Sequence, residues 1–276
     1  MPGPEGDPAL YRVDRSDADA DAEPAGWLFG TIHALPSRSR WKSDALKDAL
    51  AKSGVLIVEV ADLDDAQLRD TFNRMAFTNG LPPLEQRVSP ELRDDLDELI
   101  DNAGANPAQF RNLETWAAAL TLSSAMQANS GIDPADGVDR VLIGEYASGP
   151  VLGLETVEQQ FSLFDTLAEK EQRELLESML TEGDEDAEEM SDAWLSGDTE
   201  RLATLMNEGL GPAGDPGNLL RNRLLTRRNE SWVAAIAAQL SSGARPFVAV
   251  GAGHVGGEDG LIALLESEGW RVTRVE

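Results

Sequence analysis

The stretch Val55-Leu-Ile-Val-Glu-Val60 decides the fold that this sequence predicts. It is short and almost wholly apolar, which is typical of a strand buried on both faces of a parallel sheet. A helical pattern precedes it over residues 43–52, beginning at a serine suited to capping the first turn. Before that helix, Gly26-Trp-Leu-Phe-Gly30 has the pattern of another strand. Residues 26–60 therefore predict a strand, a helix and a strand in succession.

Strand patterns recur near both ends of the chain, and helical patterns fill most of the sequence between them. The further strand patterns are 9–13, 151–154, 246–251 and 270–275. We therefore expect an α/β (α+β) fold with a central mixed β-sheet, flanking helices and a large, mostly helical insert. The length suits a single domain over residues 1–276. Its core is expected from about 1–63, 136–158 and 244–276, and the insert, or lid, from about 64–135 and 159–243.

The composition excludes several classes of function. The 276 residues carry a formal net charge of −27, which repels nucleic-acid backbones and anionic membrane surfaces. No cysteine is present, so disulfides are excluded and a metal would need nitrogen and oxygen ligands. No apolar run approaches the roughly 20 residues that cross a bilayer, and the first residues lack the pattern of a secretory signal. We expect a soluble protein, cytoplasmic as the sequence stands and periplasmic if an export signal has been removed.

The sequence has only two histidines, and each follows an apolar run in the pattern Gly-x-x-His. His33 ends Gly30-Thr-Ile-His33, and His254 ends Gly251-Ala-Gly-His254. Neutral imidazole binds metals and accepts protons near neutral pH, so two histidines at strand ends indicate a site. The competing interpretation is that each is an ordinary core or surface residue. Gly251–Gly256 also matches the dinucleotide pattern G-x-G-x-x-G, but such a site gives no role to the motif of His33.

Glutamates end two of the predicted strands. Glu59 and Glu155 each follow a short apolar run. Functional groups gather at the carboxyl ends of parallel strands, so we expect both glutamates near the histidines, as metal ligands or as a general base. Each could instead form a salt bridge or cap a helix. Arg228 and Asn229, in a helical pattern, are candidates for binding an oxyanion or orienting a carboxylate, although a helix arginine more often packs and stays solvated.

Six motifs follow one another along the chain in an informative order. They are Leu28-Phe-Gly-Thr-Ile-His33-Ala-Leu-Pro36, Leu56-Ile-Val-Glu59, Gly137-Val-Asp139, Gly153-Leu-Glu155-Thr156, Arg228-Asn229 and Val250-Gly-Ala-Gly-His254. This set resembles the TraB/GumN family, which has bacterial members and includes the Tiki proteins. The resemblance covers nearly the whole chain, and its motifs are moderately specific together and weak singly. It implies a mixed sheet with flanking helices, as in the similar erythromycin esterases and ChaN-like haem-binding proteins.

The resemblance implies a metal-dependent hydrolase. Tiki proteins are metalloproteases that use manganese or cobalt, and the family pattern places the equivalents of His33, Glu59 and His254 in the active centre. The similarity to erythromycin esterases implies a second hydrolytic route, in which a histidine activates water without a metal. Membership of the family does not fix the substrate, which we expect to be a peptide or a small molecule.

Both lines of reasoning lead to one preferred mechanism. His33 and His254, with Glu59 or Glu155, hold a divalent metal, Mn, Co or Zn, and the remaining glutamate accepts a proton from bound water. The arginine and asparagine of the fifth motif then stabilise the oxyanion. The alternatives are a metal-free hydrolase, a noncatalytic haem- or metal-binding or regulatory protein that uses the same cleft, and a purely structural interaction protein.

Overall fold

The computed structural model describes residues 3–19, 21–32, 35–36, 38–129, 137–181, 184–210 and 218–275. The chain divides into two compact units, of which the first comprises Met1–Ala61, Ala135–Thr156 and Glu188–Glu276, and the second Asp62–Pro134 and Val157–Ala187. The first unit thus contains residues 188–243, which the sequence analysis placed in the helical insert. They belong to the first unit because their helices bury Trp194 and Trp232 in the cores on the two faces of the sheet.

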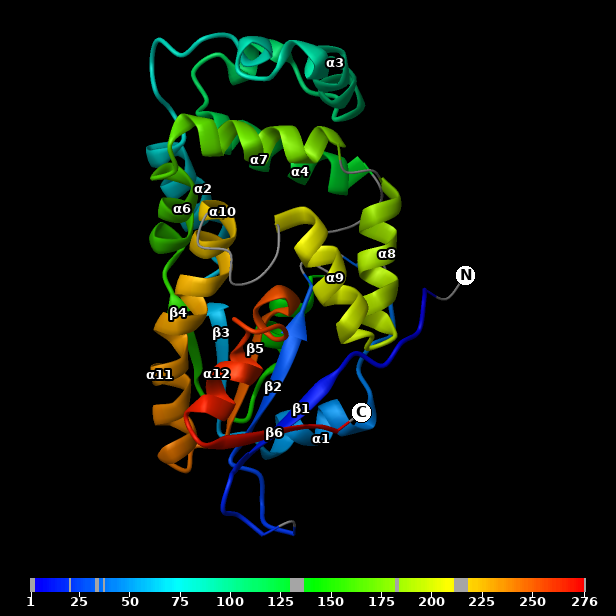
Figure 1. Ribbon diagram of the computed structural model, residues 1–276, viewed down its shortest axis with the longest axis vertical. Coiled ribbons are helices and arrows are strands. Elements are labelled where there is room, and N and C mark those ends of the chain that lie inside the picture. Colours follow the sequence, from blue (N-terminus) through cyan, green and yellow to red (C-terminus); the bar gives the residue numbers. More distant parts are fainter. Residues whose placement is uncertain are drawn as a thin grey trace. The chain divides into compact units, whose positions relative to one another are not determined.

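A six-stranded mixed sheet forms the centre of the first unit (Figure 1). Its order is β4-β3-β5-β2-β1-β6, and the strands are β1 (Leu10–Arg15), β2 (Gly26–Thr31), β3 (Val55–Val60), β4 (Val151–Glu155), β5 (Pro246–Gly251) and β6 (Trp270–Arg274). β4, β3, β5 and β2 are parallel neighbours, whereas β1 pairs antiparallel with β2 and β6. The predicted fold class is confirmed, and the four parallel strands have their carboxyl ends at one edge of the sheet.

The apolar sequence of β3 accounts for its central place. All six of its residues are buried, and it pairs in parallel with β4 on one side and β5 on the other. Leu56 and Val58 belong to the core on one face of the sheet, and Val55 and Ile57 to the core on the other face. Because neither face of this strand is suited to water, helices must cover both.

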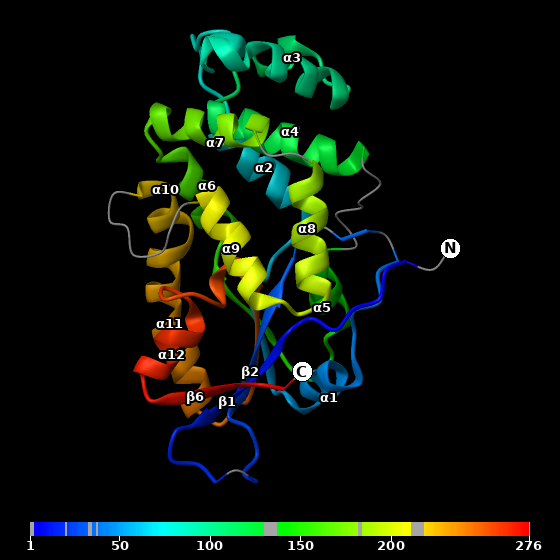
Figure 2. The same cartoon turned by 45° about the vertical axis from the view of Figure 1, so that its right-hand side comes forward.

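Helices of the first unit provide these two layers. α1 (Asp44–Lys52), α5 (Val138–Glu145), the later turns of α8 (Asp184–Leu195) and α9 (Thr199–Leu210) contribute to one core, and α11 (Arg227–Ser241) and α12 (Leu261–Ser267) to the other. Figure 2 shows α11 and α12 on one side of the strands and α1 and α5 on the opposite side. The predicted start of α1 is confirmed, because Ser43 Oγ accepts a hydrogen bond from the Leu46 amide at 3.1 Å.

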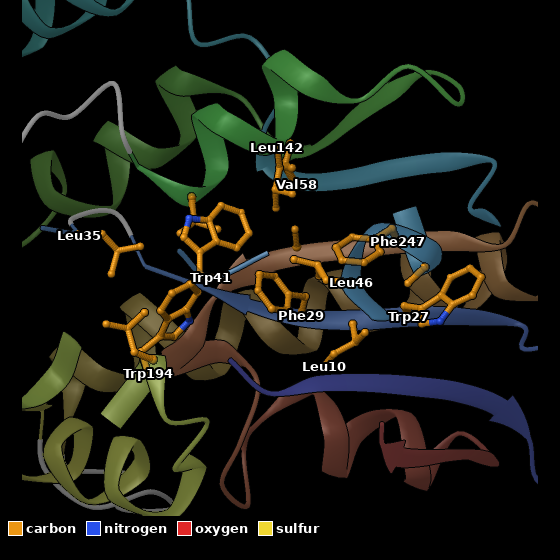
Figure 3. Close-up of a cluster of buried hydrophobic side chains, with 14 of the residues drawn as sticks. Leu10, Trp27, Phe29, Leu35, Trp41, Leu46, Val58, Leu142, Trp194 and Phe247 are labelled. Atoms are coloured by element: carbon orange, nitrogen blue, oxygen red, sulfur yellow. The ribbon is translucent and has the colours of Figure 1, made fainter. Parts of the chain in front are cut away.

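Aromatic side chains fill the core on the α1 face (Figure 3). The ring centroid of Phe29 in β2 lies 6.1 Å from that of Trp41 and 6.0 Å from those of Trp194 and Phe247. The indole N–H of Trp194 donates to the carbonyl of Gly30 at 2.7 Å. These contacts hold the end of β2, where the first Gly-x-x-His motif begins.

One helix of the first unit is divided by an irregular turn. Residues 219–241 form α10 (Leu219–Arg221), a π-helical turn η5 (Asn222–Thr226) and then α11. Such turns occur mostly as single insertions in helices and often at functional sites. Between β5 and α12 the chain forms a 3-10 turn, η6 (Ala252–His254), and a glycine-containing segment.

The second unit is helical. It contains α2 (Asp65–Met75), α3 (Arg93–Asn102), α4 (Thr115–Asn129), α6 (Val157–Asp165) and α7 (Glu169–Thr181), with 3-10 turns η1 (Leu84–Gln86), η2 (Pro90–Leu92) and η3 (Pro107–Phe110). Its core is centred on Trp116, which is fully buried. Arg87 is also fully buried and donates to the carbonyls of Pro82, Leu113 and Phe110 at 2.7, 2.6 and 3.3 Å. None of the helices within the described ranges is both long and apolar enough to cross a membrane.

Candidate active site

Three side chains with acid–base chemistry project from the carboxyl ends of adjacent strands. Glu59 is the next-to-last residue of β3, Glu155 is the last residue of β4, and His254 ends the η6 turn directly after β5. Since β3 lies between β4 and β5, these positions are neighbours along the edge of the sheet (Figure 1). Their side chains are 9%, 11% and 5% exposed, so all three groups are largely removed from water.

Arg228, in the first turn of α11, joins these three groups. Its Nε and Nη2 donate to the two carboxylate oxygens of Glu155, each at 2.9 Å, and Nη2 also donates to Glu59 Oε2 at 2.5 Å. Its Nη1 donates to the carbonyl of Leu224 and to Nε2 of His254, both at 3.0 Å. A guanidinium has five N–H groups, so every donor of Arg228 is engaged. The glutamates and the histidine therefore surround one fixed cation.

Burial and charge act in opposite directions on Arg228. Desolvation lowers the pKa of its guanidinium, but the hydrogen bonds and charges of Glu155 and Glu59 outweigh it and raise the pKa above the ordinary value. The guanidinium carbon also lies 4.6 Å from the ring centroid of Trp232, a favourable cation–π contact. Two carboxylates against one guanidinium leave the group with an excess negative charge.

Hydrogen bonds hold His254 in one tautomer. Its Nδ1 lies 2.7 Å from the side-chain oxygen of Asn229, whose amide nitrogen donates to the carbonyl of Asp259 at 2.8 Å. Because an amide oxygen only accepts, Nδ1 carries the proton and Nε2 presents a lone pair. The ring also packs on Trp232, with 4.5 Å between centroids. The result is a neutral imidazole whose basic nitrogen faces Arg228.

The glycines of the second Gly-x-x-His motif permit close packing around the histidine. The Gly251 amide donates to Glu59 Oε1 at 2.8 Å, and a Cβ atom at Gly251 would lie only 3.0 Å from that oxygen. A Cβ atom at Gly253 would lie 2.5 Å from the terminal methyl of Met206 in α9. With this packing, Glu59 Oε1 lies 3.8 Å from Nε2 of His254. One water molecule can span that separation with a hydrogen bond to each atom.

Most of the predicted site residues lie in one hydrogen-bonded group. His33 is outside the described residues, although the strand before it is described. There, Thr31 Oγ1 donates to Asp139 of the Gly137-Val-Asp139 motif at 2.7 Å, and the Val138 amide donates to the carbonyl of Ile32 at 3.2 Å. The described members of the predicted set, which the structure brings together, are Glu59, Glu155, Arg228, Asn229 and His254.

The sequence analysis missed a second ion pair that lies behind this group. Arg221 donates to both carboxylate oxygens of Asp259 at 3.2 and 3.0 Å, and Thr226 Oγ1 donates to one of them at 2.7 Å. Desolvation raises the pKa of Asp259, but the hydrogen bonds and charge of Arg221 and the bond from Thr226 outweigh it, so the pKa is lowered. The signal available in the sequence was an acidic residue shortly after the second Gly-x-x-His motif.

A cavity of about 350 Å³ adjoins the η6 turn, within the first unit. That volume lies in the range of small-molecule pockets. Ala252 and Gly253 of η6 form part of its wall, and the remaining walls include Trp194, Leu202, Met206, Asn207 and Val255. The cavity thus lies beside the turn that carries His254.

Comparison with known proteins identifies the family. The family model of TraB/PrgY/gumN matches residues 10–274. The chain belongs to the TraB/PrgY/gumN family. The uncharacterized protein YbaP of Escherichia coli (strain K12) is 28% identical over 252 residues, which cover 86% of each chain, and the YbaP protein of Shigella flexneri matches to the same extent. No solved structure matches the chain.

The described residues of this TraB/PrgY/gumN protein do not fit the metal ion that the Tiki resemblance implies. Among them, no three His, Asp or Glu side chains are grouped so as to hold a metal. Both oxygens of Glu155, Oε2 of Glu59 and Nε2 of His254 accept hydrogen bonds from Arg228. The guanidinium therefore stands at the point where their lone pairs converge, and a cation there would have to displace it.

Proposed function

We propose that this protein is a hydrolase of carboxylic esters or amides, with His254 as the general base. The observation that carries the proposal is the hydrogen-bonded series from Asn229 through His254 to Arg228 beside the buried carboxylate of Glu59. A general base needs a free lone pair, a fixed orientation and a group that stabilises its protonated form. The series fixes the orientation of the ring, and Glu59 lies beside the nitrogen that gains the proton. The Nε2 lone pair becomes available when the hydrogen bond from Arg228 Nη1 opens.

Water activation follows from the position of Glu59. When the hydrogen bond from Arg228 Nη1 to His254 Nε2 opens, a water molecule can bridge Nε2 and Glu59 Oε1, which lie 3.8 Å apart. This water can attack a carbonyl carbon while Nε2 takes its proton. The adjacent carboxylate then stabilises the imidazolium by its charge, as an acidic partner does in other histidine-based hydrolases. The same proton returns to the leaving alcohol or amine when the tetrahedral intermediate collapses.

Arg228 links this proton transfer to stabilisation of the oxyanion. Before the reaction, its Nη1 donates to Nε2 of His254. Once Nε2 holds a proton it can no longer accept, so that N–H group of Arg228 is released and can donate to the developing oxyanion. Glu155 holds the guanidinium in place through two parallel hydrogen bonds. Asn229 has both ends of its amide engaged, which favours orientation of the imidazole over contact with the oxyanion.

The carboxylate oxygens and the imidazole nitrogen that a metal would need already accept hydrogen bonds from Arg228, which favours the metal-free route over a metalloprotease. Arg228 already supplies the positive charge that a metal would bring to Glu59 and Glu155. Hydrolysis is also favoured over haem binding by His254, because an axial bond to iron would keep Arg228 Nη1 off Nε2 permanently, whereas proton transfer displaces it only during the reaction. The substrate within this proposal is a peptide or a small ester or amide.

The proposal is tested by hydrolysis of p-nitrophenyl esters of graded acyl length and of aminoacyl p-nitroanilides, after treatment of the enzyme with a chelator. We expect turnover that persists without metal and falls at least about 100-fold in His254→Gln and Glu59→Gln. The matched control is Glu145→Gln, since Glu145 is an exposed glutamate paired with Lys42 at 2.6 Å. Wild-type turnover in His254→Gln would contradict the proposal.

Metal dependence has a separate test that does not need a substrate. After dialysis against Mn, Co or Zn, we expect little metal per chain in the wild type and a gain of bound metal in Arg228→Met. Removal of the guanidinium leaves carboxylate and imidazole lone pairs, which are suitable ligands for these ions. Stoichiometric metal in the wild type, measured by mass spectrometry, would contradict the metal-free mechanism.

A further inference from the structure

The side chain of Asp259 is anchored at three points. It accepts two hydrogen bonds from Arg221 and one from Thr226, and the ion pair is almost buried, with side chains 6% and 11% exposed. Arg221 is itself fixed by donation to the side-chain oxygen of Asn207 at 3.0 Å. Asp259 lies in the segment between η6 and α12, next to a turn in which the Gly260 amide donates to the Gly257 carbonyl at 3.2 Å. The side-chain contacts of Asp259 add to this turn in fixing the backbone of residue 259.

The π-helical turn η5 makes this anchoring possible. Arg221 and Thr226 are five residues apart, and at 3.6 residues per turn an uninterrupted α-helix would point them about 140° apart. The wider π turn reduces that angle, so both side chains reach the same carboxylate. Two residues after Thr226, α11 then presents Arg228 and Asn229 to the site.

The backbone of Asp259 decides how Asn229 is oriented. Its carbonyl accepts from the amide nitrogen of Asn229 at 2.8 Å, which leaves the amide oxygen to face Nδ1 of His254 at 2.7 Å. A flipped amide would set its oxygen against the Asp259 carbonyl and lose both hydrogen bonds. The protonated nitrogen of a histidine is set by the hydrogen bond that each ring nitrogen makes. The position of residue 259 therefore affects, through Asn229, which ring nitrogen of His254 carries the proton.

We propose that Arg221 and Asp259 form a positioning pair that, together with the hydrogen bond from Arg228 Nη1 to Nε2, keeps His254 in the Nδ1-protonated tautomer. Among the described residues, the side chains of this pair form no hydrogen bond with the side chains of Glu59, Glu155 or Arg228. Their effect passes through Asn229. The consequence for catalysis rests on the proposed function, since only the Nδ1-protonated form offers Nε2 as a base, but the tautomer itself can be observed without a substrate.

The test is nitrogen NMR of the protein labelled with ¹⁵N-histidine at one neutral pH. Only two histidines are present, so His33→Gln assigns the signals. In the wild type we expect His254 to show Nδ1 as the protonated nitrogen and Nε2 as the unprotonated one. In Asp259→Ala we expect the two shifts to move towards each other, as in a mixture of tautomers. Thr226→Val removes one of the three hydrogen bonds to the carboxylate and should give a smaller shift in the same direction.

Asp14→Ala is the matched control, because Asp14 is an aspartate of the first unit that is 3% exposed and paired with Arg12 at 2.7 Å. It should leave the His254 signals unchanged. An Nε2-protonated wild type, or an unchanged tautomer in Asp259→Ala, would overturn the proposal. Where circular dichroism shows that Asp259→Ala is unfolded, Thr226→Val decides, and an unchanged tautomer in it overturns the proposal. An equal change in Asp14→Ala would also overturn it.

Hydrolysis by the same variants separates the two proposals. If the proposed function holds, kcat in Asp259→Ala falls by about 100-fold with little change in KM, because a misplaced base impairs the chemical step. A tautomer that shifts as expected in a protein without hydrolytic activity would support the positioning pair and count against the hydrolase. If the wild type hydrolyses the substrate and the His254 tautomer does not change in Asp259→Ala, the result would support the hydrolase and count against the positioning pair.

Discussion

Two buried arginines, one in each unit, are bound in contrasting ways. Arg228 of the first unit is held by two carboxylates and an imidazole, and their charges raise the pKa of its guanidinium despite desolvation. Arg87 of the second unit is held by three backbone carbonyls, and desolvation lowers its pKa. The partners of Arg228 can gain or lose protons, whereas those of Arg87 cannot. A buried arginine can thus serve chemistry or hold loops together, depending on its acceptors.

Replacing Arg228 should have the largest effect. Arg228→Met leaves Glu59 and Glu155 buried without their shared cation, so we expect the free energy of unfolding to fall by about 3–5 kcal/mol. Arg228→Lys keeps the charge but lacks the planar fork that binds Glu155 at two points, and it should recover only part of the loss. Urea unfolding measures both. The control is Arg201→Met, whose ion pair with Glu189 is largely exposed. Similar stabilities of the control and Arg228→Met would refute the assigned role.

Replacing Arg87 should destabilise the second unit alone. Arg87→Met removes the donors to the carbonyls of Pro82, Leu113 and Phe110, and we expect a loss of about 3 kcal/mol. Hydrogen exchange with mass spectrometry should show faster exchange over residues 82–113, with protection in β3 and β5 retained. The His254 tautomer should not change. Equally faster exchange in both units would contradict the assignment of Arg87 to the stability of the second unit alone.

The sequence predicted those features of the fold and the site that depend on local patterns. The apolar run of β3 and the serine cap of α1 follow from residue types a few positions apart, and the meeting of Glu59 and Glu155 follows from the parallel strands that carry them. That Arg228 orients a carboxylate was one of the expectations, but its place between both glutamates depends on how α11 packs against the sheet. No residue type over residues 222–226 signals the π turn.

The ion pair of Arg221 and Asp259 was missed for a related reason. Its residues are 38 positions apart, and their meeting depends on that same π turn. Nor did the sequence show that Arg87 is buried, since arginine is usually exposed and its acceptors are backbone atoms that every residue carries. Local patterns thus named five residues that lie together, while the hydrogen bonds among them depend on tertiary packing.

A pH series sharpens the comparison, because carboxylate partners titrate and backbone carbonyls do not. The pKa of Asp259 is lowered in the folded protein, so its contribution is complete above the ordinary pKa of 3.8 and is lost as the pH falls through the folded value. We expect Asp259→Asn to destabilise by about 1–2 kcal/mol near pH 7, with the difference from wild type vanishing below about pH 3. The effect of Arg87→Met should change less over this range, because Arg87 is bound by backbone carbonyls and interacts with Glu169, Glu114 and Glu85 only through their charges. A difference in the free energy of unfolding that does not change with pH in Asp259→Asn would contradict the lowered pKa of Asp259.

The smallest effect is expected at Arg173, a surface residue near Arg87. Its Nε donates to Glu169 one turn earlier in α7 at 3.1 Å, a pair typically worth about 0.3–0.5 kcal/mol. Its charge also lowers the pKa of Arg87, so removing it relieves a repulsion. Because these contributions oppose each other, Arg173→Ala should change the free energy of unfolding by less than about 0.5 kcal/mol, and less still at high salt. A loss above 1 kcal/mol in urea unfolding would mean that the surface pair, and not the three carbonyls alone, holds Arg87 in place.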